Sequence, residues 1–221
     1  MRVEIQGQHF ELFPERAALW TEKSVLICSD LHWGRENFLQ KFGMAIPSHS
    51  FEMESEILYH LLKSTGAREL WILGDFIHHP KGLDADLLDR LHAWLLSLQV
   101  ELKVEVAFVP GNHDRKFKEW AANLPLKIHP EGIRSGDFCF LHEPPLERTN
   151  NDYHWYGHLH PSLRIGALFG NRKIPCFLIR RREAFLPAFS RLAGGATVNF
   201  IPSDRIFGIA EKQVFEWRSK S

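Results

Sequence analysis

A chain of 221 residues can bury one sizeable hydrophobic core, and we expect a single domain over residues 1–221. Basic and acidic residues number 27 each, so no overall positive charge draws the chain onto nucleic acid or a membrane. The three cysteines are scattered, which argues against a disulfide framework and a zinc ribbon. No apolar run approaches the ~20 residues of a membrane span. Because a signal peptide is also not recognisable, we expect a cytoplasmic protein.

The first half of the chain alternates apolar runs with amphipathic segments. Short extended pieces are expected over 2–10 and 13–20. Continuous apolar runs predict buried strands over Ser24–Ser29, Glu69–Leu73 and Lys103–Val109. Apolar residues recur at helical spacing over Ser50–Thr65 and Leu83–Ser97. This alternation of strands and helices predicts a parallel βαβ arrangement.

The last third of the chain contains short strand and turn candidates and few helical stretches. These candidates cover 132–141, 154–160, 176–180, 196–200 and 205–210. We therefore expect the first half of the chain to be α/β and the last third to be mostly β. One domain can hold both parts if two sheets pack face to face.

Polar side chains that can bind metals follow each buried strand of the first half. Asp30 and His32 follow the first strand, Asp75 the second and Asn112 the third. Ligands of open α/β sheets bind outside the carboxyl ends of the strands. We therefore expect these side chains to meet at one place.

Three further histidines continue the pattern, namely His142 after another apolar run and the pair His158 and His160. Asp30 and His32, like the later pair, lie two residues apart, and in an extended segment such side chains share one face. Each motif alone is compatible with an ordinary turn, a cap or a core histidine. Their ordered combination indicates a metal site.

The donor set also indicates the kind of metal. It contains carboxylates, imidazoles and an amide but no thiolate, which suits Mn, Fe, Zn or Mg. Seven ligands exceed the needs of one ion but fit two ions that share a carboxylate. Two-metal sites, with ions about 3.5–4 Å apart, are a common device for hydrolysing phosphate esters.

In this order, the motifs D-x-H, G-D, G-N-H-D, H and G-H-x-H resemble those of the calcineurin-like metallophosphoesterase superfamily. The resemblance implies an α/β fold, a four-layer αββα sandwich of two mixed β-sheets flanked by helices, with two divalent ions at the strand ends. Mn²⁺ is the expected ion, with Fe, Zn or Mg as alternatives. By position, one ion would be bound by Asp30, His32, Asp75 and His160. The other would be bound by Asp75, Asn112, His142 and His158, with Asp75 as the bridge.

Segments outside these motifs resemble one branch of the superfamily. The segments 11–20, 175–195 and 202–210 are similar to the PdeM-type ligase-associated DNA damage response endonucleases. This resemblance implies a DNA substrate, a role in DNA repair and a functional association with an ATP-dependent DNA ligase and a helicase. The later segments carry no obvious chemistry and also suit edge strands that complete a second sheet.

Three residues are candidates for catalysis beyond the metal ligands. By resemblance, His113 points at the leaving group as a general acid or hydrogen-bond donor. Asp114 either orients the imidazole of His113 or caps the loop. His78 stands where many superfamily members have aspartate, and a histidine there in the double-strand-break repair nuclease branch lies beside the scissile phosphate. We expect His78 either to contact substrate or to lie just behind the groups that do, and His79 to face away.

These features predict a phosphodiesterase or endonuclease that cleaves phosphodiester bonds of DNA through attack by a hydroxide bridging two metals. The alternative is a small-molecule phosphohydrolase acting on a nucleotide or cyclic nucleotide. A binding module without activity is disfavoured, because every ligand position is filled. Oligomeric state stays open.

Several side chains could contact nucleic acid, and each could equally face solvent or pack in the core. They are the basic Arg35, Arg115, Lys116 and Lys118, the run 180–182, and the aromatic Trp33, Trp155 and Tyr156.

Overall fold

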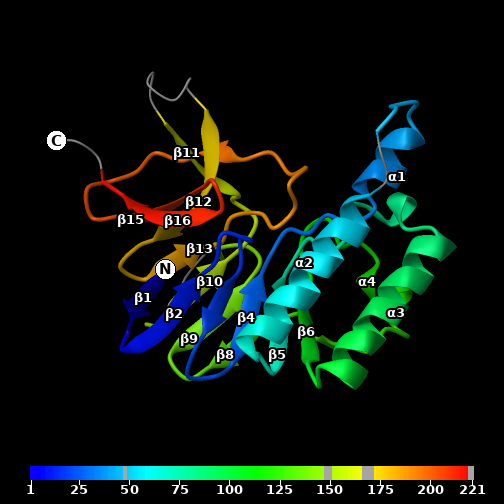
Figure 1. Ribbon diagram of the computed structural model, residues 1–221, viewed down its shortest axis with the longest axis horizontal. Helices are drawn as coiled ribbons and strands as arrows, with labels where there is room; N and C mark the ends of the chain where they lie inside the picture. The colour runs from blue at the N-terminus through cyan, green and yellow to red at the C-terminus, as the bar shows by residue number, and fades with distance from the viewer. Residues whose placement is uncertain (47–48, 147–150, 166–171, 219–221) are drawn as a thin grey trace.

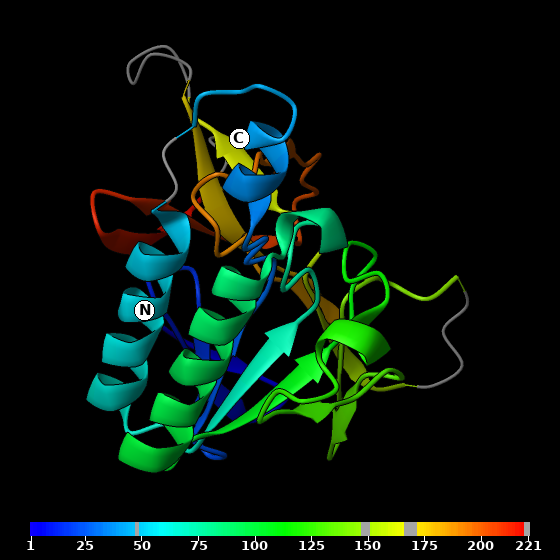
Figure 2. The same ribbon diagram turned by 90° about the vertical axis from the view of Figure 1, so that its right-hand side faces the viewer.

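The structure is a computed structural model that describes residues 1–46, 49–146, 151–165 and 172–218. These residues form two mixed β-sheets packed face to face, with the helices on the outer side of the first sheet (Figures 1 and 2). The strands of the first sheet lie side by side in sequence order: β1 (Arg2–Ile5), β2 (Gln8–Leu12), β3 (Ala18–Trp20), β4 (Val25–Cys28), β5 (Glu69–Leu73), β6 (Glu105–Val109) and β7 (Lys127–Ile128). Neighbours from β1 to β4 are antiparallel, and those from β4 to β7 are parallel.

The parallel strands are continuously apolar because both of their faces are buried. In β5, Leu70 and Ile72 pack on the helix side, whereas Trp71 and Leu73 pack against the second sheet. β4 and β6 alternate in the same way. This is the reason why the three runs show no polar alternation in the sequence.

The helices connect and cover these strands: α1 (Arg35–Gln40), α2 (Ser50–Thr65), the 3₁₀ turn η1 (Pro80–Gly82), α3 (Ala85–Glu101) and α4 (Phe117–Trp120). Helix α2 has the predicted bounds and ends at Gly66, whose φ of 65° is the left-handed conformation that glycine adopts readily. Helix α3 begins later than predicted, because the side chain of Asp84 caps it by accepting a hydrogen bond from Leu87 N at 2.9 Å.

The second sheet is built from the rest of the chain: β8 (Ile133–Ser135), β9 (Phe138–Leu141), β10 (Tyr153–Tyr156), β11 (Pro161–Arg164), β12 (Lys173–Ile179), β13 (Glu183–Phe185), β14 (Ala196–Thr197), β15 (Arg205–Ala210) and β16 (Gln213–Trp217). β10 is parallel to both β9 and β13, while β12, β15 and β16 pair antiparallel. The strand pair predicted over 132–141 is the β8–β9 hairpin.

Aromatic side chains fill the space between the sheets. The ring of Phe10 lies 4.8 Å from that of Trp155 and 5.5 Å from that of Trp20. Trp155 and Tyr156 are fully buried, and Trp33 is almost so. These aromatic residues therefore belong to the core and are not exposed platforms for bases. All three cysteines are also buried.

The predicted fold class, two mixed sheets with flanking helices, is confirmed. One detail differs, since the helices of the described ranges all lie on the side of the first sheet. Within the same ranges, no helix has the length and apolarity needed to cross a lipid bilayer.

Two adjacent leucines of α3 test the assignment of its buried face. Leu95 is 0% exposed, whereas Leu96 is 38% exposed. Leu95→Ala should lower the free energy of unfolding by about 2–5 kcal/mol, because it leaves a cavity against the first sheet. Leu96→Ala, the matched control, should change it by less than about 0.5 kcal/mol. Urea unfolding measures the free energy of unfolding of both variants. Equal effects would mean that α3 is rotated about its axis and that Leu95 does not lie on its buried face.

Candidate metal centre

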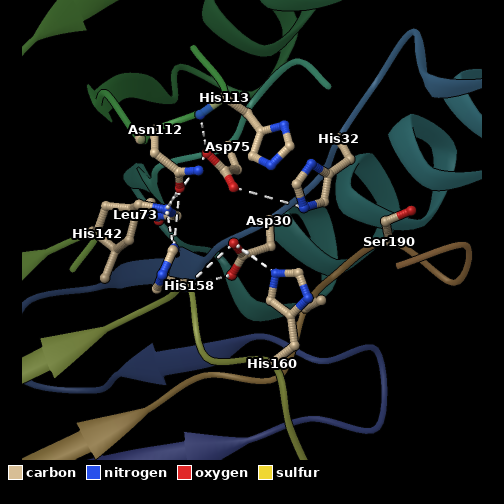
Figure 3. A network of polar contacts seen from close by, with 12 residues as sticks. Asp30, His32, Leu73, Asp75, Asn112, His113, His142, His158, His160 and Ser190 are labelled. Carbon is tan, nitrogen blue, oxygen red and sulfur yellow. Dashed lines mark hydrogen bonds and ion pairs between the residues drawn. The ribbon is translucent and has the colours of Figure 1, made fainter. Parts of the chain in front are cut away.

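The predicted ligands converge where strands of both sheets end (Figure 3). They follow β4, β5 and β6 of the first sheet and β9 and β10 of the second. Their donor atoms form two groups, each with atoms within 4.8 Å of one another: Asp30, His32 and His160 in one, and Asp75, His142 and His158 in the other. The structure thus brings together residues that are up to 130 positions apart, from Asp30 to His160.

In the first group, Nε2 of His160 lies 2.9 Å from Oδ1 of Asp30. Both carboxylate oxygens of Asp30 also accept from the backbone N–H of His158, at 3.1 and 3.2 Å. Burial lowers the pKa of His32 to about 4, so its imidazole is neutral near pH 7 and can offer a lone pair to a cation.

In the second group, three donor atoms surround one point. Nε2 of His142 lies 3.3 Å from Nδ1 of His158, and Oδ1 of Asn112 lies 3.1 Å from each of these nitrogens. Ligand atoms bound to one ion at about 2.1 Å lie about 3.0–3.4 Å from one another. The donor atoms of this group therefore have the spacing of a metal site.

Asp75 lies between the two groups (Figure 3). Its Oδ2 is 3.8 Å from Nε2 of His32, and its Oδ1 is 3.4 Å from Nε2 of His142. Oδ1 also accepts from the backbone N–H of His113 at 2.9 Å, which anchors the carboxylate. The two oxygens face different histidines, as the predicted bridging position requires.

The electrostatics of the second group favour a cation. Burial opposes charge on Asp75 and His142, yet each stabilises the charged form of the other. Burial lowers the pKa of His142, but the hydrogen bond to Asp75 and the charge of Asp30 outweigh it and raise this pKa to about 9. Burial raises the pKa of Asp75, but His142 outweighs it and lowers this pKa to about 2. A proton, or a metal ion in its place, is thus held beside a carboxylate.

Backbone carbonyls orient two of the ligand imidazoles. Nδ1 of His142 donates to Leu73 O at 2.9 Å, and Nδ1 of His160 to Gly194 O at 3.0 Å. This places a hydrogen on Nδ1, so that a ring whose other proton is replaced by a cation would offer its lone pair from Nε2, which faces the carboxylates. His158 differs, because its Nδ1 faces Asn112 and His142.

The backbone at the ligands is left-handed, which corrects one expectation. Asp30, His32, Asp75, His158 and His160 have φ between 45° and 61°. The two D-x-H and H-x-H segments are therefore not extended, and pleating is not what directs their side chains inward. Such conformations are unfavourable for residues other than glycine and persist where surrounding contacts impose them, often at functional sites.

A glycine precedes three of the ligand positions because there is no room for a Cβ. At Gly74 a Cβ would lie 2.1 Å from Nδ1 of His142, and at Gly111 it would lie 2.4 Å from Oδ1 of Asp75. At Gly157 it would lie 2.9 Å from Oδ2 of Asp30. These glycines let the ligand-bearing loops approach one another.

The three catalytic candidates have different surroundings. Nδ1 of His113 lies 2.7 Å from His78 O, and the ring of His78 stacks on that of His113 with centroids 5.1 Å apart. Among the described residues, none is a hydrogen-bond partner of the buried Nδ1 of His78. Burial first, and then the charge of Arg35, lower the pKa of His78 to about 4. His32, His78 and His113 together form a third group of converging ring nitrogens.

Asp114 caps the loop, which is one of the two roles expected from the sequence. Its carboxylate accepts from the backbone N–H of Gly111, Ile77 and Phe76, at 2.8, 3.0 and 3.3 Å. His113 is oriented by the carbonyl of His78 instead. Asp114 therefore joins the loop after β5 to the loop after β6 and holds both beside the ligands.

The structure also places His79 and several of the basic side chains that were candidates for contact with nucleic acid. Nδ1 of His79 accepts a hydrogen bond from Lys81 N at 3.0 Å. This side chain therefore caps η1 and is not grouped with the predicted metal ligands. In the basic run, Arg180 pairs with Asp204 and Glu183. Arg115, Lys116 and Lys118 are exposed.

Some contributions to the site were not predicted. The carbonyls of Leu73, Gly194 and His78 carry no side-chain signature in the sequence. Loop 189–190 also holds the first ligand loop, because Phe189 N donates to Ser29 O at 2.9 Å and Ser190 N to Asp30 O at 3.2 Å. In the sequence, the glycine that precedes each of Asp75, Asn112 and His158 was the feature that could have indicated close packing at these positions.

Comparison with known proteins identifies the family of the chain. The calcineurin-like phosphoesterase family model matches residues 23–178. The crystal structure of the Pseudomonas putida nuclease MPE is similar, with a TM-score of 0.82 and 26% identity over 98% of this chain and 99% of that one. The E. coli phosphoesterase Yfce covers 86% of this chain and 95% of its own at 18% identity, but its TM-score of 0.43 supports no argument. No curated protein sequence matches the chain.

Gly74 gives a direct test of the packed site. Gly74→Ala should displace His142 and weaken Mn²⁺ binding by about 10–100-fold, measured by calorimetric titration. Gly7→Ala is the control, because Gly7 has a similar φ of 73°, against 79° for Gly74, but no atom within 4 Å of the added Cβ. If both variants bind Mn²⁺ equally well, His142 is not a ligand.

Proposed function

Because the chain belongs to the calcineurin-like phosphoesterase family, a family of metal-dependent hydrolases, we propose that it is a phosphodiesterase or endonuclease that uses two divalent ions to cleave DNA. The observation that carries the dinuclear part is Asp75, whose oxygens face two separate groups of donors. Support for nucleic acid comes from the similarity, over nearly the whole chain, to a protein described as a nuclease.

The donor atoms fit two divalent ions, for which Mn²⁺ is our proposal. Asp30, His32, Asp75 and His160 would hold one ion, and Asp75, Asn112, His142 and His158 the other. When bound, the ions would offset the charge of the phosphate and activate the attacking water. The carbonyls of Leu73 and Gly194 fix the rings of His142 and His160, so little reorganisation is needed on binding.

His113 is the proposed proton donor to the leaving oxygen. Its Nδ1 is committed to the carbonyl of His78, so donation must come from Nε2 and requires the imidazolium form. The stacked ring of His78 keeps His113 in place and stands close enough to contact the substrate itself. Asp114 supports both residues by tying their loops together.

The repair context is a further part of the proposal. It rests on the similarity of segments 11–20, 175–195 and 202–210 to ligase-associated endonucleases. On that basis we propose that the chain acts with an ATP-dependent DNA ligase and a helicase.

A panel of substrates tests the proposed function. Mn²⁺-loaded protein should hydrolyse the diester bis-p-nitrophenyl phosphate and cut DNA, and Asp75→Asn should abolish both activities because it removes the shared carboxylate. Single- and double-stranded DNA are compared in the same assay. Turnover confined to the monoester p-nitrophenyl phosphate would overturn the nuclease proposal in favour of a small-molecule phosphohydrolase.

His113→Ala separates catalysis from metal binding. The variant should lower kcat on bis-p-nitrophenyl phosphate by about 10²–10⁴-fold, the usual contribution of a general acid, while its bound Mn²⁺ is unchanged. His79→Ala is the control, since this nearby histidine caps η1 and should leave kcat unaltered. Loss of metal from His113→Ala would show that His113 is a ligand and not the proton donor.

A further inference from the structure

A positively charged pocket lies directly beside the metal centre. It has a volume of about 190 Å³, and His160 forms part of its wall. Its charged lining includes Arg16, Lys173 and Arg191, and none of the described residues that line it is a carboxylate. A pocket of this kind is complementary to an anion, and it opens next to a residue proposed to bind metal.

Arg16 is fixed in place before any ligand binds. Its Nη1 donates to Ser190 O at 2.8 Å and to Ala188 O at 3.2 Å. Ser190 N in turn donates to Asp30 O at 3.2 Å. One segment therefore sets the position of this guanidinium relative to the metal ligands, which reduces the entropy lost when an anion binds.

The positive charges of Arg16 and Arg191 repel each other. Burial lowers the pKa of Arg16, the charge of Arg191 lowers it further, and the buried Glu54 acts in the opposite direction. Glu54 also accepts from the backbone N–H of Arg191 at 2.9 Å, and Arg191 is exposed and lines the pocket. An anion between the two guanidinium groups would relieve their repulsion.

The pocket continues into a larger groove of about 920 Å³ that shares Arg16, Pro175 and Arg191 with it. Residues of α2 and of the turn that joins β15 to β16 line this groove. Carboxylates and cations both line it, so the strongest positive charge lies at the end next to the metal centre.

We propose that Arg16, Lys173 and Arg191 form a subsite for a phosphate that flanks the scissile phosphate in a nucleic acid strand, and that the strand leaves the metal centre through the groove beside α2. This inference rests on the proposed nuclease function. The subsite contacts only backbone phosphate, so it contributes affinity and register without reading the base sequence.

The test uses the double variant Lys173→Gln, Arg191→Gln, whose side chains are exposed. The matched control is Arg68→Gln, Lys103→Gln, which removes the same charge before β5 and β6, at the edge of the sheet opposite the ligands. Both variants and the unaltered protein are assayed on a single-stranded oligonucleotide and on bis-p-nitrophenyl phosphate, which has no flanking phosphate. Arg16 is left intact because it supports the loop.

The subsite variant should raise the ratio of the oligonucleotide KM to the bis-p-nitrophenyl phosphate KM about tenfold, and should lower the slope of log KM against log salt by about 1. The control should change neither quantity. An unchanged ratio in the subsite variant, or an equal change in the control, would overturn the subsite while leaving the nuclease function in place. Failure of the unaltered protein to cut any nucleic acid would instead reject the proposed function.

Discussion

The carboxylate of Asp75 faces two sets of imidazole nitrogens at once, and the rest of the site is arranged around it. Buried between His32 and His142, this carboxylate would be unfavourable without the charge of His142 and the hydrogen bond from His113 N. The first sheet delivers it at the end of β5, and the second sheet delivers His142 at the end of β9. Face-to-face packing of the two sheets is therefore a condition for the metal centre, not only for stability.

Local strain accompanies this arrangement. Five proposed ligands have left-handed backbone, which is unfavourable by about 1–2 kcal/mol for each residue that is not glycine. Asp114 and loop 189–190 supply the hydrogen bonds that hold the strained loops. Backbone carbonyls then select the histidine tautomers, so the ligand geometry is set before metal binds.

Much of the fold could be predicted because strands and helices leave patterns of apolar residues within short stretches of sequence. The apolar run Glu69–Leu73 and the helical spacing of Ser50–Thr65 have the bounds found in the structure. Helices α1 and α4 and strands β7, β11, β13 and β16 were missed, since these short segments mix polar and apolar residues and depend on their neighbours. The structure gathers the ligand set because strand ends of both sheets meet.

Other features of the site depend on three-dimensional contacts that no motif encodes. The role of Asp114 as a loop cap, the carbonyl partners of the histidines and the pocket around Arg16 arise from segments distant in sequence. The left-handed ligand backbone was likewise invisible, because aspartate and histidine adopt it only when tertiary contacts impose it.

We propose that the carboxylate of Asp75 is shared by two ions. Anomalous diffraction from crystals grown with Mn²⁺, recorded at the manganese absorption edge, tests it most directly. We predict two peaks about 3.5–4 Å apart, one on each side of the Asp75 carboxylate. A single peak, or two peaks that Asp75 does not bridge, would contradict the account.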